Sequence, residues 1–184
     1  MHLDDYNDSY NFFCDSIPLQ NSKILDLGCG PGNISKYLIS QRPNFNIFGI
    51  DIAPNMVSLA SVNNPKAKFQ VMDIRAIDQL ELTYDGIICG FSIPYLSDAD
   101  VDKLLFDCND LLNTDGILYL SFVQGDASQS GYIIGSAGDR TYFYYHSLNY
   151  LKSKANENGI KVIKSFKVSF KKKDIHTIII LQKQ

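Results

Sequence analysis

The fold is decided by the segment KILDLGCGPGN, residues 23–33, in which a short apolar run is followed at once by three glycines. The apolar run reads as a buried strand, and Gly28, Gly30 and Gly32 precede a stretch with helical spacing. Glycines at alternate positions remove side chains from a tight strand-to-helix turn, so a ligand can approach the backbone closely. The spacing is G-x-G-x-G, and Asn33 stands where the dinucleotide-binding fingerprint G-x-G-x-x-G has its last glycine. The segment therefore predicts a ligand-binding turn of a different kind.

The alternation of apolar strands and helical stretches continues along the chain. Strands are expected at residues 23–27, 46–50, 68–72, 84–89 and 117–123. The clearest helix has one continuous apolar stripe from Val101 to Leu112. This alternation predicts an α/β fold, a doubly wound and mostly parallel sheet with helices on both faces. The last two strands, 161–170 and 175–181, are joined by a short lysine-rich turn and must therefore pair as an antiparallel hairpin.

Two segments stand outside this alternation within what we interpret as a single domain, residues 1–184. Residues 1–20 carry Tyr6, Tyr10 and Phe13 at helical spacing, which predicts a short N-terminal helix or lid. Residues 124–146 combine glycines and serines with an aromatic cluster. Long glycine-rich connections at the carboxyl edge of a sheet are usually functional loops.

Composition narrows the classes of function. The chain has 184 residues, 45% of them hydrophobic and 20% charged, with a formal net charge of -3. Nucleic-acid binding through phosphates is disfavoured, because such proteins carry a basic excess. No apolar run approaches the roughly 18 residues of a membrane span, and the N-terminus lacks the pattern of a signal peptide. Four scattered cysteines and three scattered histidines lack metal-ligand spacing, so we expect no metal and a cytoplasmic location with reduced thiols.

Four segments together carry a family resemblance. Ile24 to Asn33 resembles the signature loop of the class I S-adenosylmethionine-dependent methyltransferases. Val71 to Ile74 resembles the adenine-binding segment of that family, Asp85 to Phe91 its fourth strand and the exit from it, and Leu111 to Leu118 the helix-turn-strand that follows. The resemblance implies a seven-stranded Rossmann-like sheet with an antiparallel last strand.

The resemblance also implies a cofactor, S-adenosylmethionine, with S-adenosylhomocysteine as its product and no metal. Asp51 would accept hydrogen bonds from the ribose diol, although an acid at a strand end can also cap the next helix. Asp73 would accept the adenine amine, and Asp26 would orient the loop or meet the methionine ammonium. The cofactor-binding residues expected are Asp26, Gly28, Cys29, Gly30, Asn33, Asp51, Ile52, Met56, Met72, Asp73, Ile74, Cys89, Gly90 and Phe91.

The acceptor site is expected at the exit of the fourth strand and in the insert 124–146. Tyr95 and His146 are the candidate catalytic residues; His146 could act as a base or could only cap the helix that starts near Ser147. If the insert is extended, alternating residues share one face that could bind the acceptor. The candidate substrate-binding residues are Tyr10, Tyr95, Arg140, Tyr142 and Tyr144.

Three functions remain open, all with S-adenosylmethionine as the ligand. We favour a methyltransferase acting on a small molecule, without nucleic acid or membrane as partner. An RNA or protein amino-methyltransferase is suggested by Ser92 to Tyr95, which matches the S/N-x-P-Y element of those enzymes but begins two positions late. A non-catalytic regulatory domain that binds the cofactor is the third. The N-terminal lid is short, so the acceptor site is open or a second copy in a homodimer helps to close it.

Overall fold

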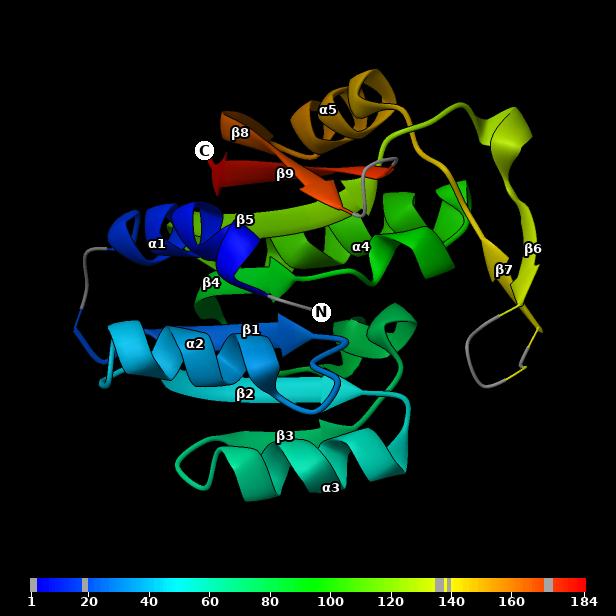
Figure 1. Ribbon diagram of the computed structural model, residues 1–184. Helices are drawn as coiled ribbons and strands as arrows, with labels where there is room; N and C mark the ends of the chain where they lie inside the picture. The colour runs from blue at the N-terminus through cyan, green and yellow to red at the C-terminus, as the bar shows by residue number, and fades with distance from the viewer. Residues whose placement is uncertain (1–2, 18–19, 135–137, 139, 171–173) are drawn as a thin grey trace.

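A computed structural model describes all of the chain except residues 1–2, 18–19, 135–137, 139 and 171–173 (Figure 1). Its centre is a seven-stranded sheet with the strand order β3-β2-β1-β4-β5-β9-β8. The strands are β1 (Lys23–Leu27), β2 (Asn46–Asp51), β3 (Lys68–Val71), β4 (Tyr84–Cys89), β5 (Leu112–Val123), β8 (Ile160–Phe170) and β9 (Asp174–Lys183). Neighbouring strands are parallel except that β9 is antiparallel to both β5 and β8. The predicted sheet with one reversed strand is confirmed.

Helices cover both faces of this sheet. The α-helices are α1 (Asn7–Asp15), α2 (Asn33–Gln41), α3 (Pro54–Asn63), α4 (Asp98–Leu111) and α5 (Leu148–Glu157). In Figure 1, α1 and α2 lie in front of the sheet and α4 lies behind it. Helix α3 packs along β3 at one edge, and α5 packs on β8 near the other. None of the helices in the described residues is long and apolar enough to cross a membrane.

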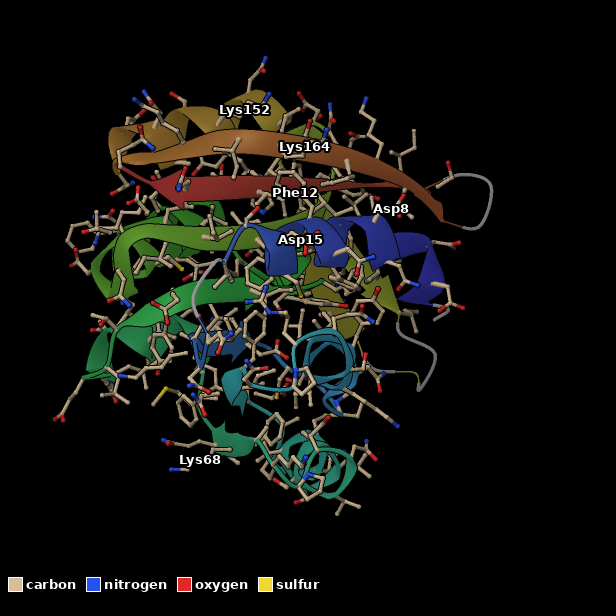
Figure 2. All side chains as sticks on the ribbon, turned by 90° about the vertical axis from the view of Figure 1, so that its left-hand side faces the viewer. Asp8, Phe12, Asp15, Lys68, Lys152 and Lys164 are labelled. Atoms are coloured by element: carbon tan, nitrogen blue, oxygen red, sulfur yellow. The ribbon has the colours of Figure 1, made fainter. Side chains whose placement is uncertain are left out.

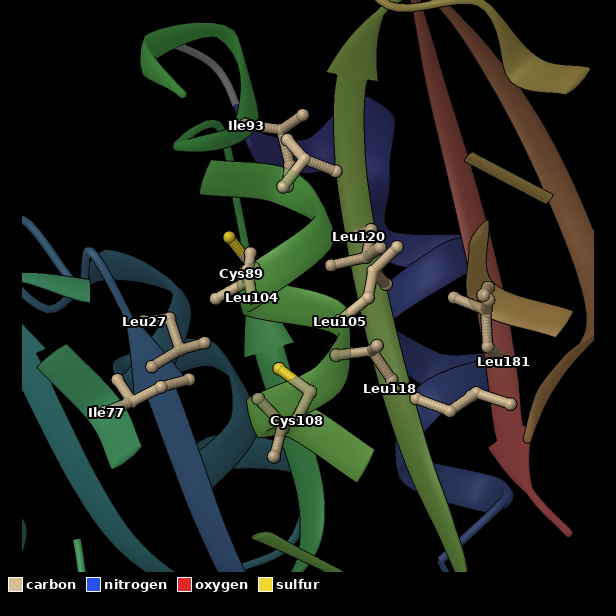
Figure 3. Packing of buried hydrophobic residues seen from close by; sticks show 14 of the residues in the cluster. Leu27, Ile77, Cys89, Ile93, Leu104, Leu105, Cys108, Leu118, Leu120 and Leu181 are labelled. Atoms are coloured by element: carbon tan, nitrogen blue, oxygen red, sulfur yellow. The ribbon is translucent and has the colours of Figure 1, made fainter. Parts of the chain in front are cut away.

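Two apolar clusters, one on each side of the sheet, form the core. Behind the sheet, the predicted stripe of α4 is buried against β4 and β5; Figure 3 shows Leu104, Leu105 and Cys108 facing Leu118 and Leu120. The second cluster, in front, joins α1 and α2 to the sheet and contains the fully buried Tyr6, Tyr10 and Phe13. Removing apolar surface from water contributes about 25 cal/mol of free energy per Å², so such clusters are the main source of stability.

The N-terminal segment forms a 3-10 turn, Leu3–Tyr6, that leads into α1. Its anchor to the far edge of the sheet is Phe12, whose ring centroid lies 5.9 Å from that of Phe166 and 5.9 Å from the ammonium of Lys164 (Figure 2). The N-terminal helix expected within residues 1–20 is therefore present over Leu3–Asp15 and packs as part of the core.

Two local predictions need correction. Asn113 to Gly116, expected to be a turn before a strand, lies inside β5; Leu112 pairs with Tyr84, and pairing resumes between Ile117 and Gly86. Asp115 has a φ of 61°, which lets the intervening residues bulge without ending the strand. The insert 124–146, expected to be a loop, contains a two-stranded antiparallel sheet of β6 (Gly131–Ile134) and β7 (Arg140–Phe143). The turn predicted at 171–174 falls mostly outside the described residues.

Candidate functional site

The glycine turn has a backbone conformation that favours glycine, as its sequence predicts. Gly28, Gly30 and Gly32 have φ values of 67°, 52° and 79°, a region that residues with a Cβ rarely adopt. A Cβ on Gly32 would lie 2.3 Å from Nδ2 of Asn64, so that position is closed by packing. A Cβ on Gly30 would meet no atom within 4 Å, so that position faces open space. The middle of the turn is thus a bare stretch of backbone beside a cavity.

Asp51, at the end of β2, ties the glycine turn to the next helix. Its Oδ2 accepts a hydrogen bond from the Gly30 backbone N–H at 2.8 Å, and its Oδ1 accepts one from the Ala53 N–H at 2.9 Å. The carboxylate therefore positions Ala53, the residue before α3, and also lines the cavity; it does not cap α3, which has no side-chain cap among the described residues. Each oxygen keeps a further lone pair for a ligand hydroxyl.

Asp26 lies fully buried beneath the same turn. Its Oδ2 accepts a hydrogen bond of 2.6 Å from the Ser35 hydroxyl on α2, whereas its Oδ1 has no partner among the described residues. Burial raises the pKa of this carboxyl to about 6, although the Ser35 hydrogen bond opposes that shift. An unpaired, buried carboxylate oxygen is costly unless a ligand or cation comes to it.

A cavity of about 440 Å³ opens at the glycine turn and the carboxyl ends of β2 and β4. Most of the predicted cofactor residues line it, namely Gly28, Cys29, Gly30, Asn33, Asp51, Ile52, Asp73, Ile74, Gly90 and Phe91. The other four predicted residues, Asp26, Met56, Met72 and Cys89, are not part of that lining. Asp26 and Cys89 are completely buried behind it, and Met72 lines a separate groove on the edge of the sheet.

Arg75 is a lining residue that the sequence reasoning missed. Its guanidinium lies 2.6 Å from the Asp73 carboxylate, and its backbone N–H also donates to that carboxylate. The Arg75 hydrogen bond lowers the pKa of Asp73. Asp73 is therefore held as an anion at the cavity rim, with part of its acceptor capacity already used. The pair is partly exposed, so its own contribution to stability is small.

A second cavity of about 310 Å³ adjoins the first and shares Phe91 and Tyr95 with it. Its walls come from the exit of β4, the carboxyl end of β5, the β6–β7 hairpin and the start of β9. The remaining lining residues are Pro94, Ser121, Phe122, Val123, Ile133, Phe143, Tyr145 and His176. Figure 1 shows the hairpin projecting beyond the carboxyl ends of the parallel strands, where ligands gather in doubly wound sheets.

The comparisons with known proteins match this geometry. A family model described as a methyltransferase domain matches residues 24–116, slightly more than half of the chain. This chain belongs to the methyltransferase-domain family. The trans-aconitate 2-methyltransferase of Escherichia coli O139:H28 is 38% identical over 103 residues, which are 55% of this chain and 40% of that protein. The chain spans between about a third and a half of the length of the first curated relatives it matches.

Solved structures share the whole fold at low identity. The magnesium protoporphyrin IX methyltransferase of Synechocystis PCC 6803, solved with bound S-adenosylmethionine, has a TM-score of 0.77 and 18% identity over 100% of this chain and 80% of its own. The [4+2]-cyclase SpnF has a TM-score of 0.75 and 15% identity over 96% of this chain and 81% of its own. These likenesses confirm the methyltransferase fold, and the cyclase shows that the fold alone does not fix the reaction.

The β6–β7 hairpin of this methyltransferase domain has two different faces. Arg140, Tyr142 and Tyr144 share one face, as the alternation predicted: the Arg140 guanidinium lies 3.8 Å from the Tyr132 ring centroid, and the Tyr142 and Tyr144 centroids are 4.6 Å apart. None of these three candidate substrate residues lines either cavity; Ile133, Phe143 and Tyr145 from the other face do. The three residues therefore lie on the side of the hairpin that faces away from both cavities, and their substrate-binding role stays a prediction.

His146 also differs from its predicted role. The ring is buried, its Nδ1 lies 3.0 Å from an Asp98 carboxylate oxygen, and its Nε2 lies 3.0 Å from the Leu96 carbonyl oxygen. Each ring nitrogen thus lies within hydrogen-bond distance of an oxygen at or just before the start of α4, and His146 does not line either cavity. The catalytic interpretation of His146 is not supported. The helix cap is Ser147, whose hydroxyl accepts a hydrogen bond from the Tyr150 N–H.

His176 is the histidine that the second cavity does contain. It lies near the start of β9, opposite Val123 of β5, and its Nδ1 lies 2.6 Å from the Tyr6 hydroxyl. The sequence carried a signal for this position, because an antiparallel partner of β5 must begin at the carboxyl edge. The sequence therefore predicts the strand, and the side chains of its first residues lie at the carboxyl edge of the sheet.

Tyr95 lines both cavities and is exposed, so its catalytic assignment stays a prediction. Tyr10, predicted to reach the acceptor, is instead fully buried, and its ring stacks on Tyr119 with centroids 5.4 Å apart. Burial raises the pKa of Tyr10 far above its usual value. Its substrate-binding role is therefore replaced by core packing.

Phe91 stands at the boundary of the two cavities in a left-handed backbone conformation, with a φ of 65°. That conformation costs on the order of 1–3 kcal/mol for a residue with a side chain. Its N–H donates to the Ser121 hydroxyl at 2.8 Å, and its ring meets Tyr6 edge-on with centroids 5.0 Å apart. These contacts hold the ring between the two sites.

Proposed function

We propose that this methyltransferase domain binds S-adenosylmethionine at the glycine turn and transfers its methyl group to a small molecule in the adjoining cavity. The observation that carries the proposal is the pair of cavities joined at Phe91 and Tyr95. A group-transfer enzyme needs its donor and acceptor sites to share such a boundary.

The residues around the first cavity fit this cofactor. It carries an ammonium and a sulfonium, and the turn lies over the buried Asp26 and beside Asp51. Asp51 would accept hydrogen bonds from the ribose hydroxyls, and Asp26, buried behind the turn, would orient the loop through its hydrogen bond from the Ser35 hydroxyl. The bare backbone at Gly30 leaves room for the methionine end. Ile52 and Ile74 would contact the adenine ring.

The chemistry supplied by the bound cofactor is a methyl group activated by positively charged sulfur. The chain itself aligns the acceptor and excludes water, which can contribute roughly 7–11 kcal/mol in favourable cases. Phe91 and Tyr95 would orient the acceptor at the boundary. A base such as His176 would help only where the acceptor has to lose a proton.

Cysteine chemistry has no part in this proposal. The cysteines of the chain are free and buried, and burial raises the pKa of Cys89 to about 12 and that of Cys29 still further. Such thiols are poor nucleophiles. A cytoplasmic location and a homodimer stay predictions.

Transfer of labelled methyl groups tests this function. The purified chain is incubated with methyl-labelled S-adenosylmethionine and separate panels of metabolites, RNA and peptides. Label in a metabolite, lost in the Asp51→Ala variant, supports the proposal. Label in RNA or peptide instead supports the amino-methyltransferase alternative. Cofactor binding without transfer to any panel supports a non-catalytic regulatory domain, and absence of binding rejects all three.

A further inference from the structure

We infer that the acceptor is a neutral, planar aromatic molecule bound between the β6–β7 hairpin and the exit of β4. This inference rests on the proposed function and adds the chemical class of its substrate. It is carried by the lining of the second cavity, which holds aromatic rings on several sides and no carboxylate or permanently cationic side chain among the described residues.

Aromatic rings from three parts of the chain form the walls. Phe91 and Tyr95 come from the exit of β4, and Phe143 and Tyr145 from β7 and the residues directly after it; Phe122 of β5 also borders the cavity but is only 2% exposed. The Tyr95 and Phe143 rings meet edge-on with centroids 6.2 Å apart, and the Phe143 and Tyr145 centroids are 5.1 Å apart. Rings arranged in this way offer both faces and edges to a flat π-system, and such aromatic pairs stabilise a complex beyond the burial of apolar area.

The charge of the lining argues against anionic acceptors. The arginines near the site are engaged elsewhere, Arg140 over the Tyr132 ring on the opposite face of the hairpin and Arg75 with Asp73 in the first cavity. A carboxylate entering the second cavity would lose its hydration without gaining a fixed cationic partner from the residues that the structure describes. Polycarboxylates are therefore poor candidates for the acceptor of this chain, although one of its relatives is a trans-aconitate 2-methyltransferase.

Apart from the phenol hydroxyls of Tyr95 and Tyr145, the polar side chains that line the cavity belong to the sheet. Ser121 of β5 and His176 of β9 face it from the sheet, where Ser121 accepts the Phe91 N–H and His176 is hydrogen-bonded to Tyr6. A ring that carries a hydroxyl or amino substituent would therefore place that polar edge toward the sheet. Its apolar edge would lie against the hairpin.

The hairpin supplies a matched pair of side chains for a test. Ile133 and Ile134 are adjacent on β6 and identical in chemistry, but only Ile133 lines the cavity. They are 43% and 78% exposed, so replacement of either with alanine leaves the core intact. Phe143→Ala removes an aromatic wall on β7 and serves as a second probe.

The experiment is a titration of the chain saturated with S-adenosylhomocysteine. The aromatic probes are 2-naphthol, 7-hydroxycoumarin and 8-hydroxyquinoline, and the carboxylate probes are trans-aconitate and citrate. We expect at least one aromatic probe to bind and no carboxylate to do so. Ile133→Ala should weaken that binding about fivefold and Phe143→Ala at least about tenfold, while Ile134→Ala leaves it unchanged.

The results distinguish failure of the proposed function from failure of the aromatic-acceptor inference. Absence of S-adenosylhomocysteine binding at the first step rejects the proposed function, and the inference falls with it. Binding of S-adenosylhomocysteine with no aromatic probe bound, or with a carboxylate bound more tightly, overturns the inference alone. Equal weakening by Ile133→Ala and Ile134→Ala also overturns it, because the cavity face would then have no special role.

Discussion

The hydroxyl of Tyr6 lies 2.6 Å from Nδ1 of His176, which joins the first turn of the chain to its last strand. Both rings also lie beside Phe91, with centroid distances of 5.0 Å for Tyr6 and 5.7 Å for His176. Burial raises the pKa of Tyr6 to about 12, so its phenol keeps its proton at neutral pH. The N-terminal segment thus fixes a wall of the second cavity.

Tyr6→Phe tests that connection by removing one hydroxyl and keeping the ring. We expect the free energy of unfolding to fall by about 1 kcal/mol, because one hydrogen bond is lost. Affinity for an aromatic probe should fall while affinity for S-adenosylhomocysteine stays unchanged. Urea unfolding and titration calorimetry measure the two effects.

Tyr37→Phe is the control, because the Tyr37 hydroxyl also makes one hydrogen bond, to Asn11, away from the second cavity. It should lower stability by a similar amount and leave probe affinity unchanged. A matching loss of probe affinity in both variants would contradict a specific role for the Tyr6–His176 contact.

Asp51→Ala should weaken S-adenosylmethionine binding at least about tenfold, because hydrogen bonds to a charged group contribute about 1.5–3 kcal/mol each. Asp85→Ala is the matched control. Asp85 also accepts two hydrogen bonds, from the Lys23 N–H and from Asn113, but at the amino end of β1. It should lower stability without changing cofactor affinity. Equal affinity of the two variants for the cofactor would remove the ribose assignment.

Gly30→Ala and Gly32→Ala should have different effects, the first mainly on cofactor affinity and the second mainly on the stability of the fold. Both glycines have positive φ, so alanine costs about 1 kcal/mol of conformational strain at either position. The Gly32 variant also collides with Asn64 and with α3 at Ala60, so we expect a stability loss of about 2 kcal/mol or more. The Gly30 variant should fold and bind the cofactor poorly, because its methyl group projects into the cavity.

Thermal unfolding and cofactor titration of the two variants provide the comparison. Wild-type affinity in Gly30→Ala would mean that the cofactor does not approach that part of the turn.

Because of Asp26, the free energy of unfolding should depend on pH, and the direction of that dependence can be predicted. Its pKa is raised from 3.8 to about 6 in the folded state, so between these values the folded protein binds more protons than the unfolded chain. The free energy of unfolding therefore falls as pH rises from 4 to 7, and the buried charge costs about 3 kcal/mol above pH 6.

Asp26→Asn removes that titration. Denaturant unfolding of both proteins across pH 4 to 7 should show the variant gaining stability relative to wild type as the pH rises through 6. Parallel curves for the two proteins would contradict a raised pKa at Asp26.

Much of the fold followed from local pattern. The apolar stripe of α4 and the strand-glycine-helix segment at residues 23–33 each satisfy one periodicity and one burial requirement, so sequence alone predicts them. The bulge at Asn113 to Gly116 did not follow, because its residues are typical of a turn and only the pairing of Leu112 with Tyr84 keeps them within a strand. Tertiary pairing overrode local turn chemistry there.

The cofactor side of the site was also more predictable than the acceptor side. Gly30 and Asp51 belong to elements joined by short connections, so their meeting is a property of one strand-turn-helix unit and its neighbour. His176, Tyr6 and Phe143 come from distant parts of the chain. Alternation correctly grouped Arg140, Tyr142 and Tyr144 on one face of β7, but periodicity cannot tell which face turns toward the sheet.

The most direct test of the central claim is isothermal titration of the purified chain with S-adenosylmethionine, S-adenosylhomocysteine and, for comparison, NAD. The account predicts saturable one-to-one binding of the first two ligands and none of NAD, because the turn is built around G-x-G-x-G with Asn33 in the place of a third fingerprint glycine. No heat from either adenosyl ligand, or tighter binding of NAD, would contradict it.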